Sequence, residues 1–303
     1  MPSARATSRA LARRRSAVRL TAAGLGVALG LGVLGLAWPR KDRSLAPETL
    51  ESPADLAKPP ARPVTVLVVG VDADRLTDPS NGAAPPGPAN SDALLMVQVQ
   101  PAGPLQVLEI PIELPVQLPG QSKPQALGSL YRQGGVALVA DAVRELLGLP
   151  PGQPDRYAVV GRATLRQLVD GLDRLDVSPP IAMRYVDQRQ KLRIDLQAGL
   201  QRFDGQQIEQ LVRFRSPTSG EAGRRAQHQL VLRSLLRELA LPLKLPLLAG
   251  LGHSLLPQTQ TNLTEGELLS LLAAGLSQHD GVQITAFPSA ASGTAPPVWP
   301  SSP

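Results

Sequence analysis

The sequence contains no cysteine, and this absence excludes a thiol nucleophile, a disulfide framework and thiolate metal ligands. Only three histidines are present and they are scattered, so a metal site built on histidine is not expected. Aromatic residues make up 3% of the chain, whereas 27 glycines and 31 prolines imply many turns. With 303 residues, of which 43% are hydrophobic, the chain can bury a sizeable core, and we expect one main domain.

The folded part of the chain also lacks a surplus of positive charge. The net charge of +6 comes from residues 1–43, which carry nine Arg or Lys and a single acid. Residues 44–303 carry 22 basic and 24 acidic groups. A surface that binds nucleic acid or another polyanion along its length is therefore not expected, and a DNA-binding regulator is disfavoured.

One long uncharged run stands near the N-terminus, at residues 20–38. Nineteen residues in a helix span about 28 Å, close to the hydrocarbon thickness of a bilayer. The basic segment 1–19 before the run predicts a cytoplasmic N-terminus and a single-pass signal-anchor in the cytoplasmic membrane. A cleaved signal peptide is the alternative.

The composition changes twice after this run. Residues 39–63 are rich in proline and charge, and they read as a linker. Residues 289–303 are of low complexity and are expected to be disordered. The folded domain is therefore predicted at 64–288, on the extracytoplasmic side of the membrane.

Strand and helix patterns alternate through this domain, which predicts an α/β layered fold. The run VTVLVVGV at 64–71 is typical of a strand that is buried on both faces. Further strands are expected at 93–101, 105–118, 157–161 and 282–287, a hairpin at 181–199, and helices at 136–149, 163–175, 204–215, 223–239 and 263–276.

Two aspartates flank the first two expected strands. Asp72 follows the end of the first strand, where open α/β sheets bind ligands, and Asp92 stands just before the second. Two neighbouring carboxylates could hold Mg²⁺ together with phosphate oxygens, because this ion prefers oxygen ligands. The alternative is that each aspartate caps a turn.

Arginines gather in the stretch LVRFRSPTSGEAGRR at 211–225. Arg213 and Arg215 are two apart and would share one face of an extended segment, while Arg224 and His228 would share one face of a helix. Arginine binds phosphate through paired donors, so an anionic ligand is one interpretation. A solvated charged loop is the other.

The order of these segments resembles the LytR-CpsA-Psr family over roughly residues 64–245. The resemblance rests on GVDADR, NSDALLMV, IPIELPV, a helix ending LLGLP, YAVV, LVDGL, GLQRFDGQQ, LVRFR and GEAGRRAQHQ, in that order. It implies an α-β-α sandwich with a central mixed sheet and an apolar tunnel for a lipid. It also implies an anchored envelope enzyme that transfers a glycopolymer from a polyprenyl-diphosphate carrier to peptidoglycan, with Mg²⁺ at the diphosphate.

The resemblance assigns roles to particular residues. Asp72 and Asp92 fall on the metal-site aspartates of the family. Its diphosphate-binding positions correspond to Arg213, Arg215 and Arg224, with His228 and Arg75 as further candidates. Glu113 is the candidate catalytic base or orienting carboxylate, and Arg213 and Arg215 would stabilise charge in the reaction.

The chain departs from the family pattern at several of these positions. Asn90 stands where the family usually carries Arg, and Ile112–Glu113 replaces an Arg-Asp pair. Gln227 and His228 differ from the usual Arg-Gln, and Arg75 lies one residue from the usual arginine place. The expected function is a glycopolymer phosphotransferase. The alternative is a relative without catalysis that binds a polyprenyl diphosphate or acts as a scaffold.

Overall fold

The computed structural model describes residues 50–78, 87–216, 218–277 and 282–287. The expected signal-anchor at 20–38, the basic segment before it and the C-terminal segment 289–303 lie outside these residues. No helix in the described ranges is long and apolar enough to cross a membrane.

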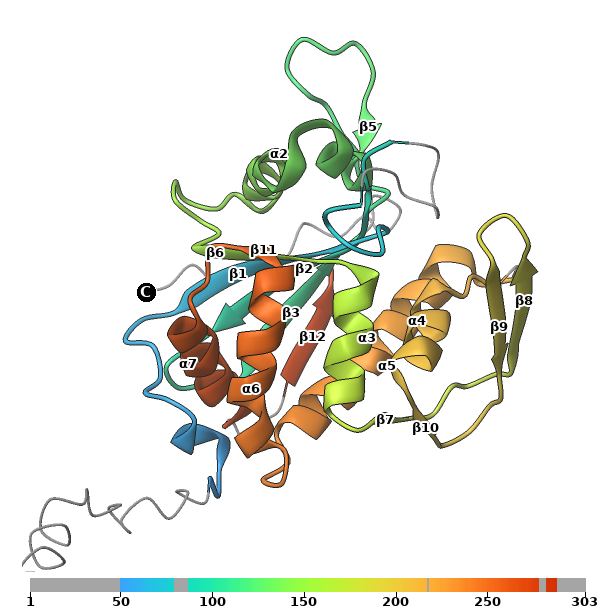
Figure 1. Ribbon diagram of the computed structural model, residues 1–303. Helices are drawn as coiled ribbons and strands as arrows, with labels where there is room; N and C mark the ends of the chain where they lie inside the picture. Colours follow the sequence, from blue (N-terminus) through green and yellow to red (C-terminus); the bar gives the residue numbers. More distant parts are fainter. Residues whose placement is uncertain (1–49, 79–86, 217, 278–281, 288–303) are drawn as a thin grey trace, which may run out of the picture. The chain divides into compact units, whose positions relative to one another are not determined.

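A six-stranded mixed sheet forms the centre of the domain (Figure 1). Its strand order is β11-β6-β1-β2-β3-β12. The pairs β1/β6 and β3/β12 are parallel, and the other three pairs are antiparallel. The strands are β1 (Val64–Val71), β2 (Ser91–Val99), β3 (Leu105–Ile110), β6 (Arg156–Val160), β11 (Gln260–Thr261) and β12 (Val282–Ala286). The expected α/β fold with a central mixed sheet is therefore present.

Helices pack on both faces of this sheet, because its central strands are apolar on both sides. On one face, α2 (Leu130–Leu147) contributes Val139 and Val143 to a cluster with alternate residues of β1, β2 and β3. On the other face, α5 (Gly220–Leu239) and α7 (Glu265–Leu276) pack against the intervening residues, among them Val97 and Val107. The sheet is thus enclosed between two helical layers.

A second apolar cluster lies beside the sheet. It joins α3 (Arg162–Gly171), α4 (Gly205–Arg213), α5 and α6 (Leu245–Leu255) around the fully buried Phe203. Two small strand pairs complete this region: β7 (Leu175–Val177) with β10 (Gln201–Phe203), and β8 (Met183–Asp187) with β9 (Leu192–Leu196). A short pair, β4 (Pro115–Val116) and β5 (Gln125–Ala126), follows β3. The β8–β9 pair confirms the expected hairpin.

Helix ends follow the local sequence signals. Asp204 caps α4 and Thr264 caps α7, each in a capping box with the residue three positions later. Gly148 ends α2 in the left-handed conformation that glycine adopts without strain. The start of α2 differs from the expected position, since the helix begins at Leu130 and passes through two non-helical glycines, Gly134–Gly135.

Part of the segment assigned to the linker contacts the domain. Residues Pro53–Asp55 form a short 3₁₀ helix, η1, which lies against α7. Leu50 and Leu56 pack on the second apolar cluster, and the Ser270 hydroxyl donates to the Lys58 carbonyl at 2.7 Å. Residues 50–58 of the expected linker therefore pack against the domain.

Candidate functional site

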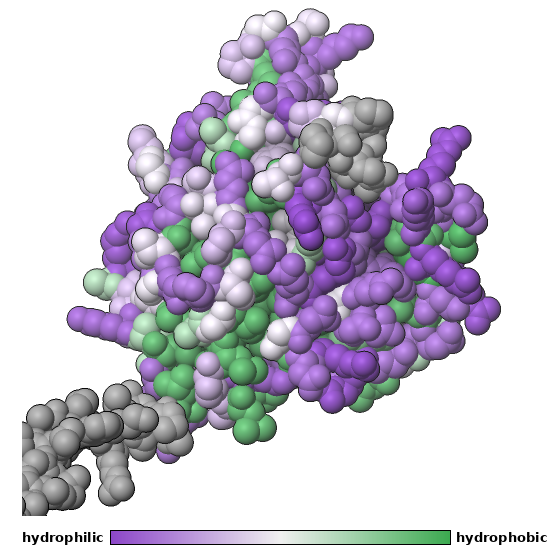
Figure 2. Space-filling model, in the orientation of Figure 1, coloured by the Kyte–Doolittle hydropathy of each residue, from purple (hydrophilic) through white to green (hydrophobic). Residues whose placement is uncertain are grey.

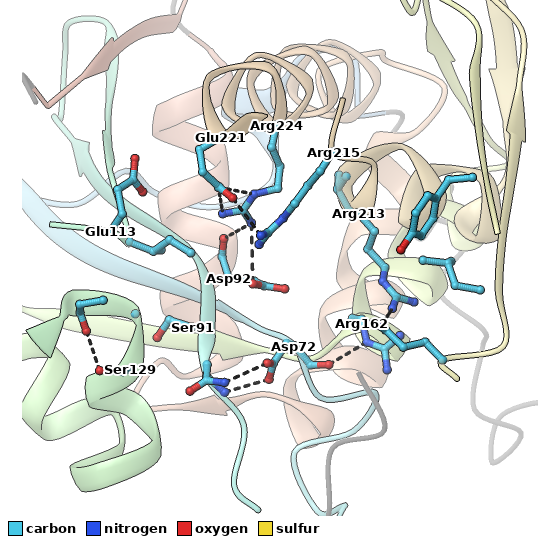
Figure 3. Close-up of a pocket in the computed structure, with 18 residues that line it drawn as sticks. Asp72, Ser91, Asp92, Glu113, Ser129, Arg162, Arg213, Arg215, Glu221 and Arg224 are labelled. Atoms are coloured by element: carbon cyan, nitrogen blue, oxygen red, sulfur yellow. Dashed lines mark hydrogen bonds and ion pairs between the residues drawn. The ribbon is translucent and has the colours of Figure 1, made fainter. Parts of the chain in front are cut away.

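A polar cavity of about 650 Å³ lies where the C-terminal end of β1 meets the start of β2, α4 and the N-terminal ends of α3 and α5 (Figure 3). Its charged lining residues are the carboxylates Asp72, Asp92, Glu113 and Glu221 and the arginines Arg162, Arg213, Arg215 and Arg224. Four negative and four positive groups thus share one cavity.

Asp72 follows β1 directly, as expected, and is 8% exposed. Its Oδ1 accepts a hydrogen bond from the Asn90 backbone N–H at 2.8 Å, and its Oδ2 accepts from Asn90 Nδ2 at 3.2 Å. Burial raises the pKa of Asp72 and the charge of Asp92 raises it further, although the Asn90 hydrogen bonds oppose this rise. Asn90 therefore fixes the orientation of this carboxylate.

Asp92 lies inside β2 and not before it, which corrects the expected position. The pairing of β1 with β2 shifts at this point: Gly70 faces Ala93 and Val71 faces Ser91, so Asp92 is the extra residue of a β-bulge. Bulges beside functional sites redirect a side chain away from the regular strand pattern. The carboxylate of Asp92 enters the same cavity as that of Asp72 (Figure 3).

Arg213 and Arg215 both line the cavity, but they do not share one face of an extended segment as their spacing suggested. Arg213 is the last residue of α4 and only the chain after it is extended. Its guanidinium binds Glu209 at 3.1 Å and Gln190 at 2.6 Å. Arg215 binds Glu221 at 3.0 Å. The end of α4, not a shared strand face, brings the two arginines to the cavity.

Arg224 is buried in the first half of α5 and is 4% exposed. Its Nε and Nη2 atoms bind the Glu221 carboxylate at 2.8 and 2.6 Å. Its Nη1 atom donates to the Asp92 backbone carbonyl at 2.8 Å and lies 3.7 Å from the Asp92 carboxylate. Arg224 therefore connects the aspartate side of the cavity to the arginine side.

His228 lies one helical turn beyond Arg224 and faces a different space. Its Nε2–H donates to the Val212 carbonyl at 3.1 Å, and the ring lines the second cavity described below, not the polar one. Burial and the nearby charge of Arg224 lower the pKa of His228 to about 4. The imidazole is therefore neutral at physiological pH and supplies no positive charge to an anion.

Of the two remaining candidates, Glu113 lines the polar cavity and Arg75 does not. Glu113 lines the polar cavity together with Ile112, and its carboxylate is paired with Arg225. Arg75 is not brought to the polar cavity: it borders a separate cavity of about 330 Å³ with Thr164, and its backbone N–H binds Asp78. The structure gives Arg75 no place beside the other candidate residues.

Arg162 was not singled out from the sequence, yet it lies between the aspartates and the arginine cluster. It begins α3 directly after β6, and its Nε donates to the Asp72 carbonyl at 3.0 Å. The turn depends on Gly161, where an added Cβ would lie 2.8 Å from the Asp74 carbonyl. The available signal was its position just past a strand end, the same signal that pointed to Asp72.

Glu209 is a buried carboxylate behind this wall of the cavity. It accepts hydrogen bonds from Arg162 at 2.6 Å and Arg213 at 3.1 Å, and it is also paired with Arg166. Burial alone would raise its pKa, but the arginines outweigh burial and the pKa of Glu209 is lowered. Glu209 therefore stays ionised and holds two of the cavity arginines in place.

A second cavity, of about 330 Å³, adjoins the first and is mostly apolar. It lies between the sheet and the helices α3 and α5, which contribute Leu165, Leu168, Leu232 and Leu235. The two cavities share five lining residues: Asp92, Arg162, Val212, Arg213 and Arg224. Residues 240–251 are not among its lining residues. A charged chamber thus opens beside an apolar one.

The sequence model of the LytR_cpsA_psr family matches residues 42–295. The chain belongs to the LytR-CpsA-Psr family. Among curated relatives, the regulatory protein MsrR of Staphylococcus aureus is 25% identical over 192 residues, which covers 62% of this chain. The chain spans about half the length of that relative, since the match covers 54% of it.

Solved structures have the same fold as this LytR-CpsA-Psr chain. TagV of B. subtilis is 19% identical, with a TM-score of 0.60 over 75% of this chain and 85% of that one. Protein gbs0355 of Streptococcus agalactiae is 18% identical, with a TM-score of 0.62 over 74% and 77%. A structure of TagT bound to LI-WTA is 18% identical, with a TM-score of 0.56 over 78% and 84%.

In this family member the donor set for a metal is small. No group of three or more His, Cys, Asp or Glu residues comes together as a metal site within the described part of the chain. Asp72 and Asp92 line the same cavity, and their carboxylates are hard oxygen donors that could share one cation. Such a pair fits an ion that takes its remaining ligands from water and from a bound phosphate.

Proposed function

We propose that this protein is a membrane-anchored phosphotransferase that moves a glycopolymer from a polyprenyl-diphosphate carrier to peptidoglycan or another envelope acceptor. The observation that carries the proposal is the junction of the two cavities. Carboxylates and arginines line the polar chamber, and an apolar chamber begins at Arg224 and Asp92. A lipid diphosphate likewise consists of a charged diphosphate group that is joined directly to an apolar chain.

The polar chamber would hold the diphosphate. Arg213, Arg215 and Arg224 offer donors of the kind that bind phosphate in pairs, and Arg162 adds a fourth guanidinium. The lining acids cancel the charge of these arginines, so a diphosphate would leave the chamber with a net negative charge. Mg²⁺ at Asp72 and Asp92 would offset that charge and polarise the phosphate oxygens when bound.

The reaction would form one P–O bond and break another. An acceptor hydroxyl would attack the phosphorus next to the glycan, and the bond from that phosphorus to the bridging oxygen would break, releasing polyprenyl phosphate. Glu113, which lines the cavity and is paired with Arg225, would take the hydroxyl proton. The arginines would stabilise the charge on the leaving oxygens.

The apolar chamber would take the first part of the polyprenyl chain. Leucine and valine side chains line it, and contact with such a surface favours a hydrocarbon over water. The related fold of TagT bound to LI-WTA supports a glycopolymer ligand. Membership in the LytR-CpsA-Psr family supports the same reaction class.

A relative that binds the carrier without transfer is the second candidate, and Ile112 favours it. Ile112 lines the polar cavity where the family usually carries Arg. In this alternative the arginines and the apolar chamber still bind the lipid diphosphate, but the positive charge beside the reacting phosphorus is missing.

A transfer assay separates these two functions. The purified full chain would receive a lipid-linked glycan donor and a peptidoglycan acceptor with Mg²⁺, and direct binding of the donor would be measured in parallel. Transfer that is lost in Asp72→Asn supports the transferase. Binding without transfer supports the second candidate, and the absence of both rejects the two together.

The proposed location is the cytoplasmic membrane, with the N-terminus inside and the described domain outside. The support is the uncharged run 20–38 with basic residues before it. Protease added to intact cells or spheroplasts should degrade the domain and leave the N-terminal segment protected. A released protein whose N-terminus lies near residue 39 would reject the anchor.

A further inference from the structure

The turn between α5 and α6 and the first half of α6 expose an apolar surface that the proposed chemistry does not use. Leu243 is 88% exposed, more than any other large hydrophobic side chain in the described ranges, and Leu241 and Leu247 are also exposed. Every exposed residue of the stretch 241–250 is uncharged: Leu241, Pro242, Leu243, Pro246, Leu247, Ala249 and Gly250. Apolar residues gather over this part of the molecule in Figure 2.

The single charged residue of this stretch points away from the surface. Lys244 Nζ donates to the Leu172 carbonyl at 2.6 Å and lies 3.7 Å from Glu238, and its side chain is 16% exposed. The neighbouring Leu245 and Leu248 are buried and anchor α6 to the core. The exposed side of 241–250 is therefore both apolar and free of charge, which is unusual for a surface in contact only with water.

The position of this surface in the chain favours a lipid bilayer as its partner. Leu50, the first described residue, packs on the same apolar cluster as Leu245 and Leu248. Eleven residues separate Leu50 from the uncharged run 20–38, and a chain of this length reaches at most about 40 Å. A membrane that holds this run would thus lie within about 40 Å of Leu50.

The apolar cavity extends toward the same end. Along α5 its lining passes from Arg224 to Leu235, a rise of about 16 Å for eleven residues. The helix ends at Leu239, two residues before the exposed surface begins. The cavity end farthest from the arginines therefore lies on the side of the 241–250 surface.

We propose that the 241–250 surface inserts into the interface of the bilayer to which the chain is anchored, and so holds the apolar cavity toward the lipid. The inference rests on the membrane attachment in the proposed function, but not on transfer. Because the surface carries no cation, insertion depends on apolar contact and not on anionic headgroups.

The absence of cysteine allows a direct test on the full chain. Leu243→Cys would carry the only thiol, labelled with an environment-sensitive fluorophore, in the chain reconstituted into phosphatidylcholine vesicles and recovered by flotation. Leu200→Cys is the matched control, because Leu200 is 76% exposed and lies between β9 and β10. We expect the label at 243 to have blue-shifted emission relative to the label at 200. Lipids that carry a quencher on their acyl chains should quench the label at 243 several-fold more than the label at 200.

Further measurements exclude the other occupants. The quenching at 243 should persist in high salt and should not grow when anionic lipid is added. The double substitution Leu241→Glu and Leu247→Glu should abolish the quenching at 243, while the vesicle-bound chain still floats. Both positions are exposed, so the substitutions should leave the domain folded. Equal quenching at 243 and 200, loss of quenching in salt, or failure to float overturns the proposal. Excimer formation between pyrene labels at 243 in detergent also overturns it, by assigning the surface to a second copy.

Discussion

The Glu221 carboxylate binds both the Nε and the Nη2 atoms of the Arg224 guanidinium, at 2.8 and 2.6 Å. The same carboxylate binds Arg215 at 3.0 Å. Glu221 therefore supplies the negative charge between two arginines that are expected to bind a diphosphate. Phosphate oxygens and this carboxylate would compete for the same donors.

This competition predicts the behaviour of Glu221→Gln. Without ligand, the variant should lose about 1–3 kcal/mol of stability, because Arg224 is buried while Glu221 is partly exposed. Pyrophosphate with Mg²⁺ should then raise the melting temperature of the variant more than that of the wild type, since a bound anion replaces the missing charge. Thermal unfolding with and without ligand measures both effects. Equal ligand shifts in the two proteins would show that Glu221 does not occupy the anion site.

The two aspartates should make Mg²⁺ and diphosphate binding cooperative. Each ligand should stabilise the wild-type protein more when the other is present, because a shared cation offsets the charge of the phosphates. Asp72→Asn and Asp92→Asn should each remove this cooperativity while leaving the protein folded. Asp141→Asn is the matched control, since Asp141 is an exposed acid of α2 outside the cavity. Cooperativity that survives both cavity substitutions would reject the metal site.

His228 should make folding stability depend on pH. Its pKa is lowered to about 4 in the folded protein by burial and by Arg224, although Asp92 and Glu221 oppose the shift. The unfolded histidine titrates near its ordinary value of about 6.5, so between these two values the unfolded state binds more protons and stability falls as the pH is lowered. The loss from this residue should be about 2 kcal/mol between pH 7 and pH 5.

Urea unfolding of the wild type and His228→Gln at both pH values isolates this effect. The wild type should lose more stability on acidification than the variant, because glutamine has no proton to gain. Diphosphate affinity should change little over the range where a free histidine titrates, since the ring is neutral throughout. A parallel loss of stability in the two proteins would place His228 in a more solvated environment than the structure does.

Much of the fold follows from local sequence patterns. The strand at 64–71 was predicted with its observed bounds, and the capping boxes of Asp204 and Thr264 each involve residues only three positions apart. These features depend on neighbouring residues, so a single sequence contains the information for them. The start of α2 was missed because Gly134 and Gly135 interrupt the helical pattern.

The site was predicted less completely because its geometry depends on pairing between distant segments. The bulge that places Asp92 in the cavity is a property of the β1–β2 register, which no local pattern specifies. Arg162 reaches Asp72 only because β6 lies parallel to β1. Arg75 was misplaced for the converse reason, since sequence proximity to Asp72 does not fix the direction of the loop that follows.

Ile112 bears on whether the chain catalyses transfer or only binds the carrier. The residue lines the polar cavity beside Glu113, and an added Cβ at Gly128 would lie 3.0 Å from the Ile112 Cβ. A missing donor next to a reacting phosphorus typically costs about 10²–10³ in rate, or about 3–4 kcal/mol of transition-state stabilisation. We therefore expect donor binding by the native chain with slow or absent transfer.

Ile112→Arg should raise turnover more than it raises donor affinity, because the new charge acts mainly on the transition state. Ile112→Met is the matched control, since it keeps an uncharged side chain of similar volume. Transfer rate and donor binding would be measured for all three proteins, and thermal unfolding would confirm that the arginine is accommodated beside Gly128. Native turnover equal to that of the folded Ile112→Arg protein would show that the isoleucine is no handicap. Loss of donor binding in the native chain would leave Arg213, Arg215 and Arg224 as structural ion pairs only.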